Sequence, residues 1–179
     1  IPVPGIVNGR AVLQTIKGAR FNSWSEVEVE VRDGFALVPP NLSLMAIVHR
    51  HGRNDPKPAL AIIEGWDRWG GAFPTSYSHD SHNLILYGHD AAELALAANT
   101  VIGMHGGIVV VKGGEVVAKL AYPVAGMLSL EEPSEVGLAH KRIVEAAGEI
   151  CAWQPPYRTF KALSGQSLAC NPGPHLTDV

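Results

Sequence analysis

Six consecutive polar side chains, Ser78 to Asn83, stand directly before the apolar stretch Leu84 to Tyr87. We call this segment the polar run; it holds two imidazoles, one carboxylate, two hydroxyls and one amide. Each of these groups needs a hydrogen-bond partner when water is removed, so the run is either a functional site or a heavily hydrogen-bonded turn. Imidazole titrates near neutral pH and can act as acid or base, so proton transfer is one chemistry that the run suits.

Histidines concentrate around the polar run. Five of the eight in the chain fall between His49 and His89, a window that also holds four acidic residues. If the strand ending at His49 lies beside the strand beginning near Asn83, a nitrogen-rich cluster forms that suits a divalent metal or proton transfer. The alternative is that these imidazoles satisfy backbone groups at turns. The spacing of His79 and His82 matches neither a helical i, i+4 pair nor a zinc motif.

An aromatic, glycine-rich segment, residues 65–73, precedes the polar run. Trp66 and Trp69 could wall a pocket for a planar ring. Anchoring in the core or at an interface is the alternative, because tryptophan dominates contact energy at both kinds of site. A serine nucleophile is not indicated, since Ser81 beside His82 lacks the Gly-x-Ser-x-Gly elbow.

Composition excludes several classes of protein. The chain has 179 residues, 46% of them apolar and 17% charged, which is typical of a packed domain and leaves room for a large interface. The formal net charge is −3 and no Lys/Arg cluster forms, so nucleic acid is not an expected partner. No apolar stretch approaches the ~20 residues that cross a bilayer, so no membrane is expected. Two cysteines, Cys151 and Cys170, favour a reducing cytoplasm.

The elements that would position these residues predict an α+β domain with a mixed β-sheet. The first forty residues alternate apolar and polar, which predicts an N-terminal antiparallel strand unit with a turn at Asp33-Gly34. Short apolar runs predict central strands, and two main helices, the first capped by Asp90, are expected to pack on one side of the sheet. The region from Trp153 onward is expected to pack irregularly. The predicted strands span residues 11–16, 27–31, 35–38, 44–48, 59–63, 84–87, 108–111 and 116–120, and the predicted helices span 91–104 and 134–151.

Several motifs follow one another in a recognisable order and spacing. The most specific is the His-Asp-Ser-His-Asn sequence of residues 79–83; the others are residues 48–52, 65–72, 93–99, 106–111, 114–116 and 123–129. Together they resemble the C-terminal domain of bacterial adenine deaminases, which belong to the amidohydrolase superfamily. The resemblance covers residues 44–179. It departs from the family at His49, where a glutamate is usual, and in the tail from Ser164 to His175, as in a divergent, adenine-deaminase-like branch.

The resemblance implies hydrolytic deamination of adenine, or of a related cyclic amidine or amide, by a cytoplasmic enzyme of purine metabolism. It implies a divalent metal, manganese or iron, held by a separate (β/α)8 barrel, so no metal ligand is assigned to this chain. The chain would be the C-terminal part of a homo-oligomeric enzyme and catalytically incomplete alone. Residues 1–40 would be a short β-rich segment that links to the barrel, and residues 41–179 the α+β domain.

Under this hypothesis the polar run faces the active site of the barrel, where a purine-like substrate binds. His82 or His79 would transfer a proton or orient the substrate, with Asp80 fixing the tautomer. The predicted catalytic residues are His79, Asp80, His82 and Asn83, and the predicted substrate contacts are Ser81, Trp66 and Trp69. One alternative is a non-catalytic structural module that mediates oligomerisation, in which the run is a buried network. Another is a self-contained metal-binding protein.

Overall fold

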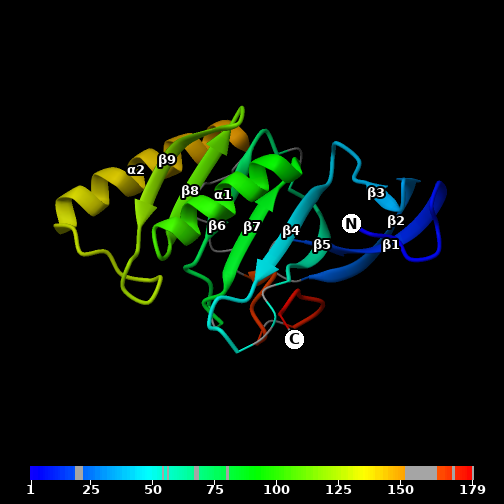
Figure 1. Cartoon of the computed structure of the whole chain (residues 1–179), viewed down its shortest axis with the longest axis horizontal. Helices are drawn as coiled ribbons and strands as arrows, with labels where there is room; N and C mark the ends of the chain where they lie inside the picture. The colour runs from blue at the N-terminus through cyan, green and yellow to red at the C-terminus, as the bar shows by residue number, and fades with distance from the viewer. Residues whose placement is uncertain are drawn as a thin grey trace.

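A nine-stranded mixed sheet forms the centre of the computed structural model, which describes residues 1–18, 22–53, 55, 57–66, 69–79, 81–151, 165–170 and 172–178 (Figure 1). The strands lie in the order β3-β2-β1-β5-β4-β7-β6-β8-β9. β1 and β5 are parallel, and the other neighbours are antiparallel. The strands are β1 (Gly9–Lys17), β2 (Ser23–Arg32), β3 (Phe35–Leu37), β4 (Ser43–Val48), β5 (Ala59–Glu64), β6 (Ala72–Thr75), β7 (Leu84–Gly88), β8 (Gly107–Lys112) and β9 (Glu115–Ala121), and the helices are α1 (Ala91–Gly103) and α2 (Pro133–Ile150).

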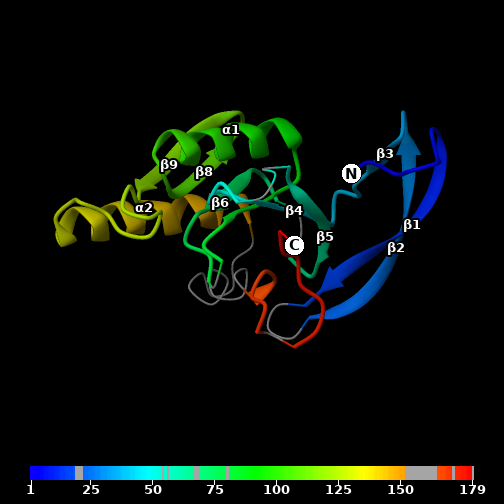
Figure 2. The same cartoon turned by 60° about the horizontal axis from the view of Figure 1, so that its bottom comes forward.

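β1, β2 and β3 form an antiparallel unit that extends away from the two helices, and we call it the arm (Figure 2). Asp33 and Gly34 have φ angles of 50° and 81°. Positive φ at both central residues is what a type I′ hairpin turn requires, so the predicted turn is confirmed. The arm joins the rest of the sheet through two residue pairs between β1 and β5.

β4 and β7 occupy the centre of the sheet, as their apolar sequences predict. All five residues of β7 are buried. Successive side chains of a strand point to opposite faces, so Leu84 and Leu86 join one core cluster while Ile85 and Tyr87 join another. The sheet therefore has a hydrophobic core on each face.

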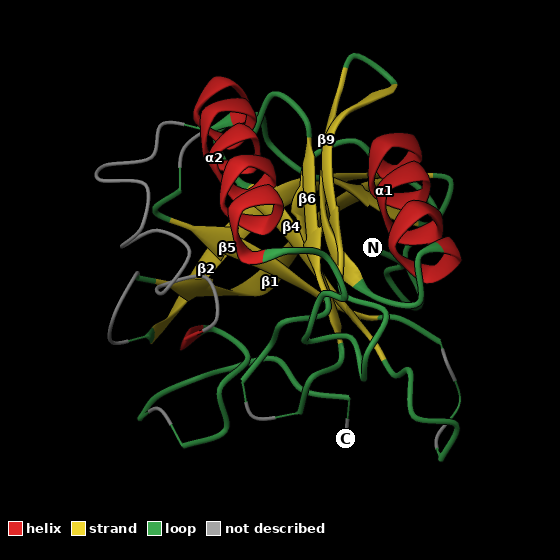
Figure 3. Ribbon diagram, turned by 90° about the vertical axis from the view of Figure 1, so that its left-hand side faces the viewer, coloured by secondary structure: helices red, strands yellow, loops and turns green. Residues whose placement is uncertain are grey.

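The two helices cover opposite faces of the sheet, so the expectation that both lie on one side is wrong (Figure 3). α1 packs Leu94, Ala97 and Val101 against the cluster that contains Leu84 and Leu86. α2 packs its own apolar stripe into the other cluster, through Ile143, Ala147 and Ile150. The unbroken apolar runs of the central strands need cover on both faces, which one layer of helices cannot give.

β6 is the strand that the sequence pattern does not predict. It has four residues, Ala72–Thr75, and its third residue is Pro74. Proline lacks the N–H that a central strand donates, and this normally argues against a strand. β6 nevertheless pairs with β7 along its whole length and with β8 at Ala72 and Thr75.

The described part of the C-terminal segment, residues 165–170 and 172–178, packs irregularly along the base of the arm, as predicted. Asn22 donates from its side-chain amide to the carbonyl of Pro174 at 2.9 Å, and Gln166 donates to the carbonyl of Gly18 at 2.9 Å. The start of this region, from Trp153, lies outside the described residues. Among the helices that the structure describes, none is long and apolar enough to cross a membrane.

Candidate functional site

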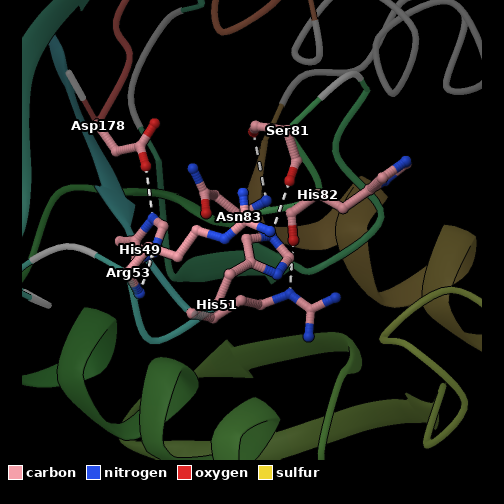
Figure 4. Close-up of polar contacts among 8 residues, drawn as sticks. His49, His51, Arg53, Ser81, His82, Asn83 and Asp178 are labelled. Carbon is pink, nitrogen blue, oxygen red and sulfur yellow. Dashed lines mark hydrogen bonds and ion pairs between the residues drawn. The ribbon is translucent and has the colours of Figure 1, made fainter.

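The polar run lies at the end of the sheet where β4 finishes and β7 begins. The two strands pair antiparallel, with Val48 opposite Leu84, so the residues after β4 meet the residues before β7. His51 donates from Nε2 to the carbonyl of Ser81 at 2.8 Å (Figure 4). The two strands are therefore neighbours, which is the condition on which a histidine cluster depends. We call residues 49–53 and 76–83, together with Asp178, the polar end.

His49 is held by hydrogen bonds on both ring nitrogens. Its Nδ1 lies 2.6 Å from Oδ2 of Asp178, and its Nε2 accepts the backbone N–H of Arg53 at 3.1 Å (Figure 4). An accepting Nε2 carries no proton, so in this geometry the ring donates from Nδ1 to Asp178. The side chain of His49 is 7% exposed. In this geometry neither nitrogen is available as a general base or as a metal ligand.

Asp178 is the member of the polar end that sequence reasoning missed. Burial alone would raise the pKa of its carboxyl group, but hydrogen bonds from the side chains of His49 and Asn83 outweigh burial and hold that pKa below its usual range. The carboxylate is therefore charged at neutral pH and ties the C-terminal segment to β4 and β7. His49 and Asp178 are 129 positions apart, and no local pattern links residues at that separation.

Asn83 and Ser78 are buried members of the run. Asn83 is 1% exposed and Ser78 is fully buried. The side-chain oxygens of both, Oδ1 and Oγ, lack a hydrogen-bond partner among the described residues. A substrate at the surface does not reach these atoms, and the amide of Asn83 instead serves Asp178. The catalytic role of Asn83 stays a prediction, while its contact in the structure is with the C-terminal segment.

His79, Ser81 and His82 are the members of the run closest to solvent. His79 and Ser81 are exposed, and His82 is half-buried. The ring of His82 lies 6.1 Å from that of His79 and 6.4 Å from that of Tyr77, centroid to centroid. The Nδ1 atom of His82 is buried, and Oγ of Ser81 accepts the backbone N–H of Asn83 at 3.3 Å. Asp80, predicted to fix the tautomer of a neighbouring histidine, lies outside the described residues.

The backbone of His82 is left-handed, with a φ of 51°. Histidine adopts this region more often than most side chains, yet it is uncommon outside glycine. The N–H of His82 donates to the carbonyl of Ser78 at 2.6 Å, closing a turn across the run. The conformation sets the direction in which the imidazole leaves the chain.

The structure does not bring Trp66 and Trp69 to the polar run. Both precede β6, whose start pairs with the end of β7, so they lie at the opposite end of the sheet. Trp69 is 2% exposed and stacks on Tyr87 with 5.9 Å between ring centroids. Trp66 packs against the same core, and its carbonyl accepts from the thiol of Cys151 at 3.5 Å. These contacts are those of core anchors, and a substrate contact by either residue stays a prediction.

Two open hollows lie away from the polar run. One, of about 470 Å³, is lined by β1 and β2 of the arm. The other, of about 540 Å³, lies between the loop that follows β9 and the start of α2. Among the described residues no group of three or more His, Cys, Asp or Glu side chains could hold a metal ion. The described residues of the polar run line neither of these two hollows.

The family model and the similar proteins that match this chain agree with one another. Residues 20–179 match the adenine deaminase C-terminal domain. An adenine deaminase of Serratia proteamaculans is 50% identical over the whole chain, and one of Klebsiella pneumoniae is 49% identical over 99% of it. A protein named adenine deaminase 2, of Agrobacterium fabrum, is 46% identical over 93% of it. The chain spans about 30% of the length of these relatives.

Proposed function

Because this chain belongs to the adenine deaminase C-terminal domain family, we propose that it is the C-terminal part of a hydrolase that converts adenine to hypoxanthine and ammonia. A related cyclic amidine or amide is the alternative substrate. The relatives are more than three times as long as the chain, which supports a catalytic barrel outside the 179 residues. Residues 1–40 would link to that barrel, and residues 41–179 would form the accessory domain.

The polar run would face the active site of the barrel. The observation that carries this proposal is the exposure of His79 and Ser81, beside a half-buried His82 whose Nδ1 is buried, on a loop next to the buried contacts of His49 and Asn83 with Asp178. An imidazole exposed on an ordered loop suits a site completed by a second body.

Hydrolytic deamination adds water at the ring carbon that bears the amino group and releases that group as ammonia. A proton must therefore reach the leaving nitrogen, and the imidazole of His82 or His79 would supply it or orient the ring. A divalent metal, manganese or iron, would lower the pKa of the attacking water. The described residues of this chain do not fit that metal, because both nitrogens of His49 are engaged and no three ligand side chains meet. The metal would belong to the barrel.

The test is a set of histidine variants in the complete enzyme. His82→Asn keeps a side chain that tolerates left-handed backbone, and we expect kcat/KM for adenine to fall about 100-fold with little change in melting temperature. His79→Gln tests the neighbouring ring. His105→Asn is the matched control, because His105 is exposed and also left-handed, with a φ of 62°. If His82→Asn and His79→Gln both keep wild-type kcat/KM, the polar run has no catalytic role.

A structural module is the second candidate, and the buried contacts of His49, Asn83 and Asp178 favour it. In that case the polar end stabilises the fold or an oligomer and does not act on substrate. The variants of His79 and His82 would then lower the melting temperature and leave kcat/KM unchanged. Measuring both quantities on the same preparations separates the two functions.

The setting of the complete enzyme is also part of the proposal. We expect a cytoplasmic enzyme of purine metabolism, because Cys151 and Cys170 are both free thiols. We expect a homo-oligomer, because the low charged fraction leaves room for a large interface. Light scattering after size-exclusion chromatography of the complete enzyme measures the oligomer, and metal analysis of the same sample identifies the ion.

A further inference from the structure

Arg50 connects the polar run to a second loop, residues 122–128. Its guanidinium donates from Nε to the carbonyl of His82 and from Nη2 to the carbonyl of Ala125. Both acceptors are main-chain atoms and not carboxylates. Arg50 is half-buried, and this burial lowers the pKa of its guanidinium.

The second loop is built to receive the guanidinium. Gly126 has a φ of +74°, and a Cβ at this position would lie 2.3 Å from Nη2 of Arg50. A Cβ at Gly106 would in turn lie 2.4 Å from Cα of Gly126. Ser76, which is fully buried, donates to the carbonyl of Gly126 at 2.7 Å and accepts the N–H of Gly107 at 2.8 Å. The loop is therefore pinned against β8 at the spot where Arg50 enters.

We propose that Arg50 is a positioning residue for the polar run. By holding the carbonyl of His82, it fixes the left-handed backbone of that residue and the direction of its imidazole. Arginine is required because its planar fork donates in two fixed directions at once, whereas a lysine ammonium is a single point donor. Only the kinetic consequence of this inference rests on the proposed function; the structural consequence does not.

Hydrogen exchange tests the structural consequence in the complete enzyme. In Arg50→Met we expect backbone amides of residues 76–83 and 122–128 to exchange about tenfold faster or more, with those of the arm unchanged. Arg142→Met is the matched control, because Arg142 is exposed on α2. Unchanged exchange in both loops overturns the inference, and so does equal acceleration in the arm, which would report general destabilisation.

A glycine pair tests the same contact from the opposite side. Gly126→Ala places a methyl group where the guanidinium lies, so residues 76–83 should exchange faster although Arg50 is intact. Gly114→Ala is the matched control, because Gly114 has a similar φ of +77° and no atom within 4 Å of its added Cβ. The left-handed φ angles are similar at the two positions, so the clash with the guanidinium is the intended difference between the variants. Equal exchange at residues 76–83 in both variants overturns the inference.

Kinetics test the consequence for catalysis. In Arg50→Lys and Arg50→Met we expect kcat for adenine to fall about 10- to 100-fold with KM within about twofold, because a misdirected imidazole affects turnover more than binding. Faster exchange at residues 76–83 with unchanged kcat would overturn the positioning role. If the wild-type enzyme does not deaminate adenine, the proposed function fails, and the exchange experiments still decide whether Arg50 orders the run.

Discussion

The arm and the polar end both carry charged and polar side chains, but the two regions use them differently. In the arm, Arg10 and Glu28 form an ion pair at 2.9 Å with side chains that are 75% and 56% exposed. At the polar end, His49 and Asp178 meet at 2.6 Å with side chains that are 7% and 18% exposed. Water competes for the polar groups of the first pair and barely for those of the second. Contacts of similar length therefore contribute differently to the free energy of unfolding.

The regions also differ in the separation of their partners along the chain. Arg10 lies opposite Glu30 in the antiparallel register of β1 and β2, which makes Glu28 its diagonal neighbour on the same face. His49 and Asp178 meet only because the C-terminal segment returns to β4 after the sheet has been built. The arm is therefore held by local pairing, and the polar end by contacts that depend on the complete fold.

The largest effect should come from His49→Ala. The substitution removes a hydrogen bond of Asp178 and leaves the backbone N–H of Arg53 without its acceptor, so we expect a loss of about 2–3 kcal/mol in the free energy of unfolding. Urea denaturation measures it. His175→Ala is the control on the same segment, because that imidazole bonds only two residues away, to Gly173, and should cost about 0.5 kcal/mol or less. Equal losses of unfolding free energy in the two variants would show that the buried contact of His49 stabilises the fold no more than the exposed contact of His175.

Ser76→Ala should have the next effect in size. The change leaves the carbonyl of Gly126 and the N–H of Gly107 without their buried partner, and we expect a loss of about 1–2 kcal/mol. The counterpart in the arm is Ser23→Ala, whose exposed hydroxyl lies 3.5 Å from the carbonyl of Lys17. That variant should stay within about 0.5 kcal/mol of wild type. A larger loss of unfolding free energy in Ser23→Ala than in Ser76→Ala would contradict the expected difference between the arm and the polar end.

Acid should weaken the contact between Asp178 and His49 at the polar end. Hydrogen bonds hold the pKa of Asp178 below its unfolded value of about 3.9, so the stability that they contribute is complete above that pH. It is lost as the pH falls from there through the folded pKa, because the native state then has to bind the proton. Denaturation of wild type and Asp178→Asn between pH 6 and pH 2 measures the difference, which should shrink with acid. A constant difference would show that Asp178 contributes no proton linkage.

The smallest effect should come from the exposed ion pair of the arm. Removing Glu28 by alanine substitution should change the free energy of unfolding by about 0.5 kcal/mol or less, because the pair is hydrated on both sides. The same measurement in 1 M salt should reduce the difference further. A loss above about 1 kcal/mol that persists in salt would show that exposed ion pairs do stabilise the arm.

The sequence predicts what is local and misses what is not. The central strands, the Asp33-Gly34 turn and the cap of α1 by Asp90 follow from neighbouring residues, and the structure confirms them. β6 was not predicted because Pro74 opposes strand formation locally, while pairing on both sides overrides it. The placement of the helices on both faces also depends on the assembled sheet.

The candidate site divides in the same way. The meeting of the residues around His49 and Asn83 could be predicted from strand order, because both flank apolar strands. The role of Asp178 could not, since a carboxylate far along the chain gives no periodic signal. From the sequence, Trp69 could either wall a pocket or anchor the core. Its stacking on Tyr87 in the core depends on the fold, and composition does not reveal it.

The long-range contacts of the C-terminal segment have a consequence for folding during synthesis on the ribosome. Asn22 can bond Pro174, and Gly18 can bond Gln166, only after the C-terminal segment has been synthesised. His49 can bond Asp178 only after another 129 residues have been added. The hairpins can form as the chain emerges, because their partners are close in sequence. The joint between the arm and the main sheet cannot reach its final form until translation has passed residue 178. A nascent chain stalled before that point should expose the base of its arm to proteases that leave the finished protein intact.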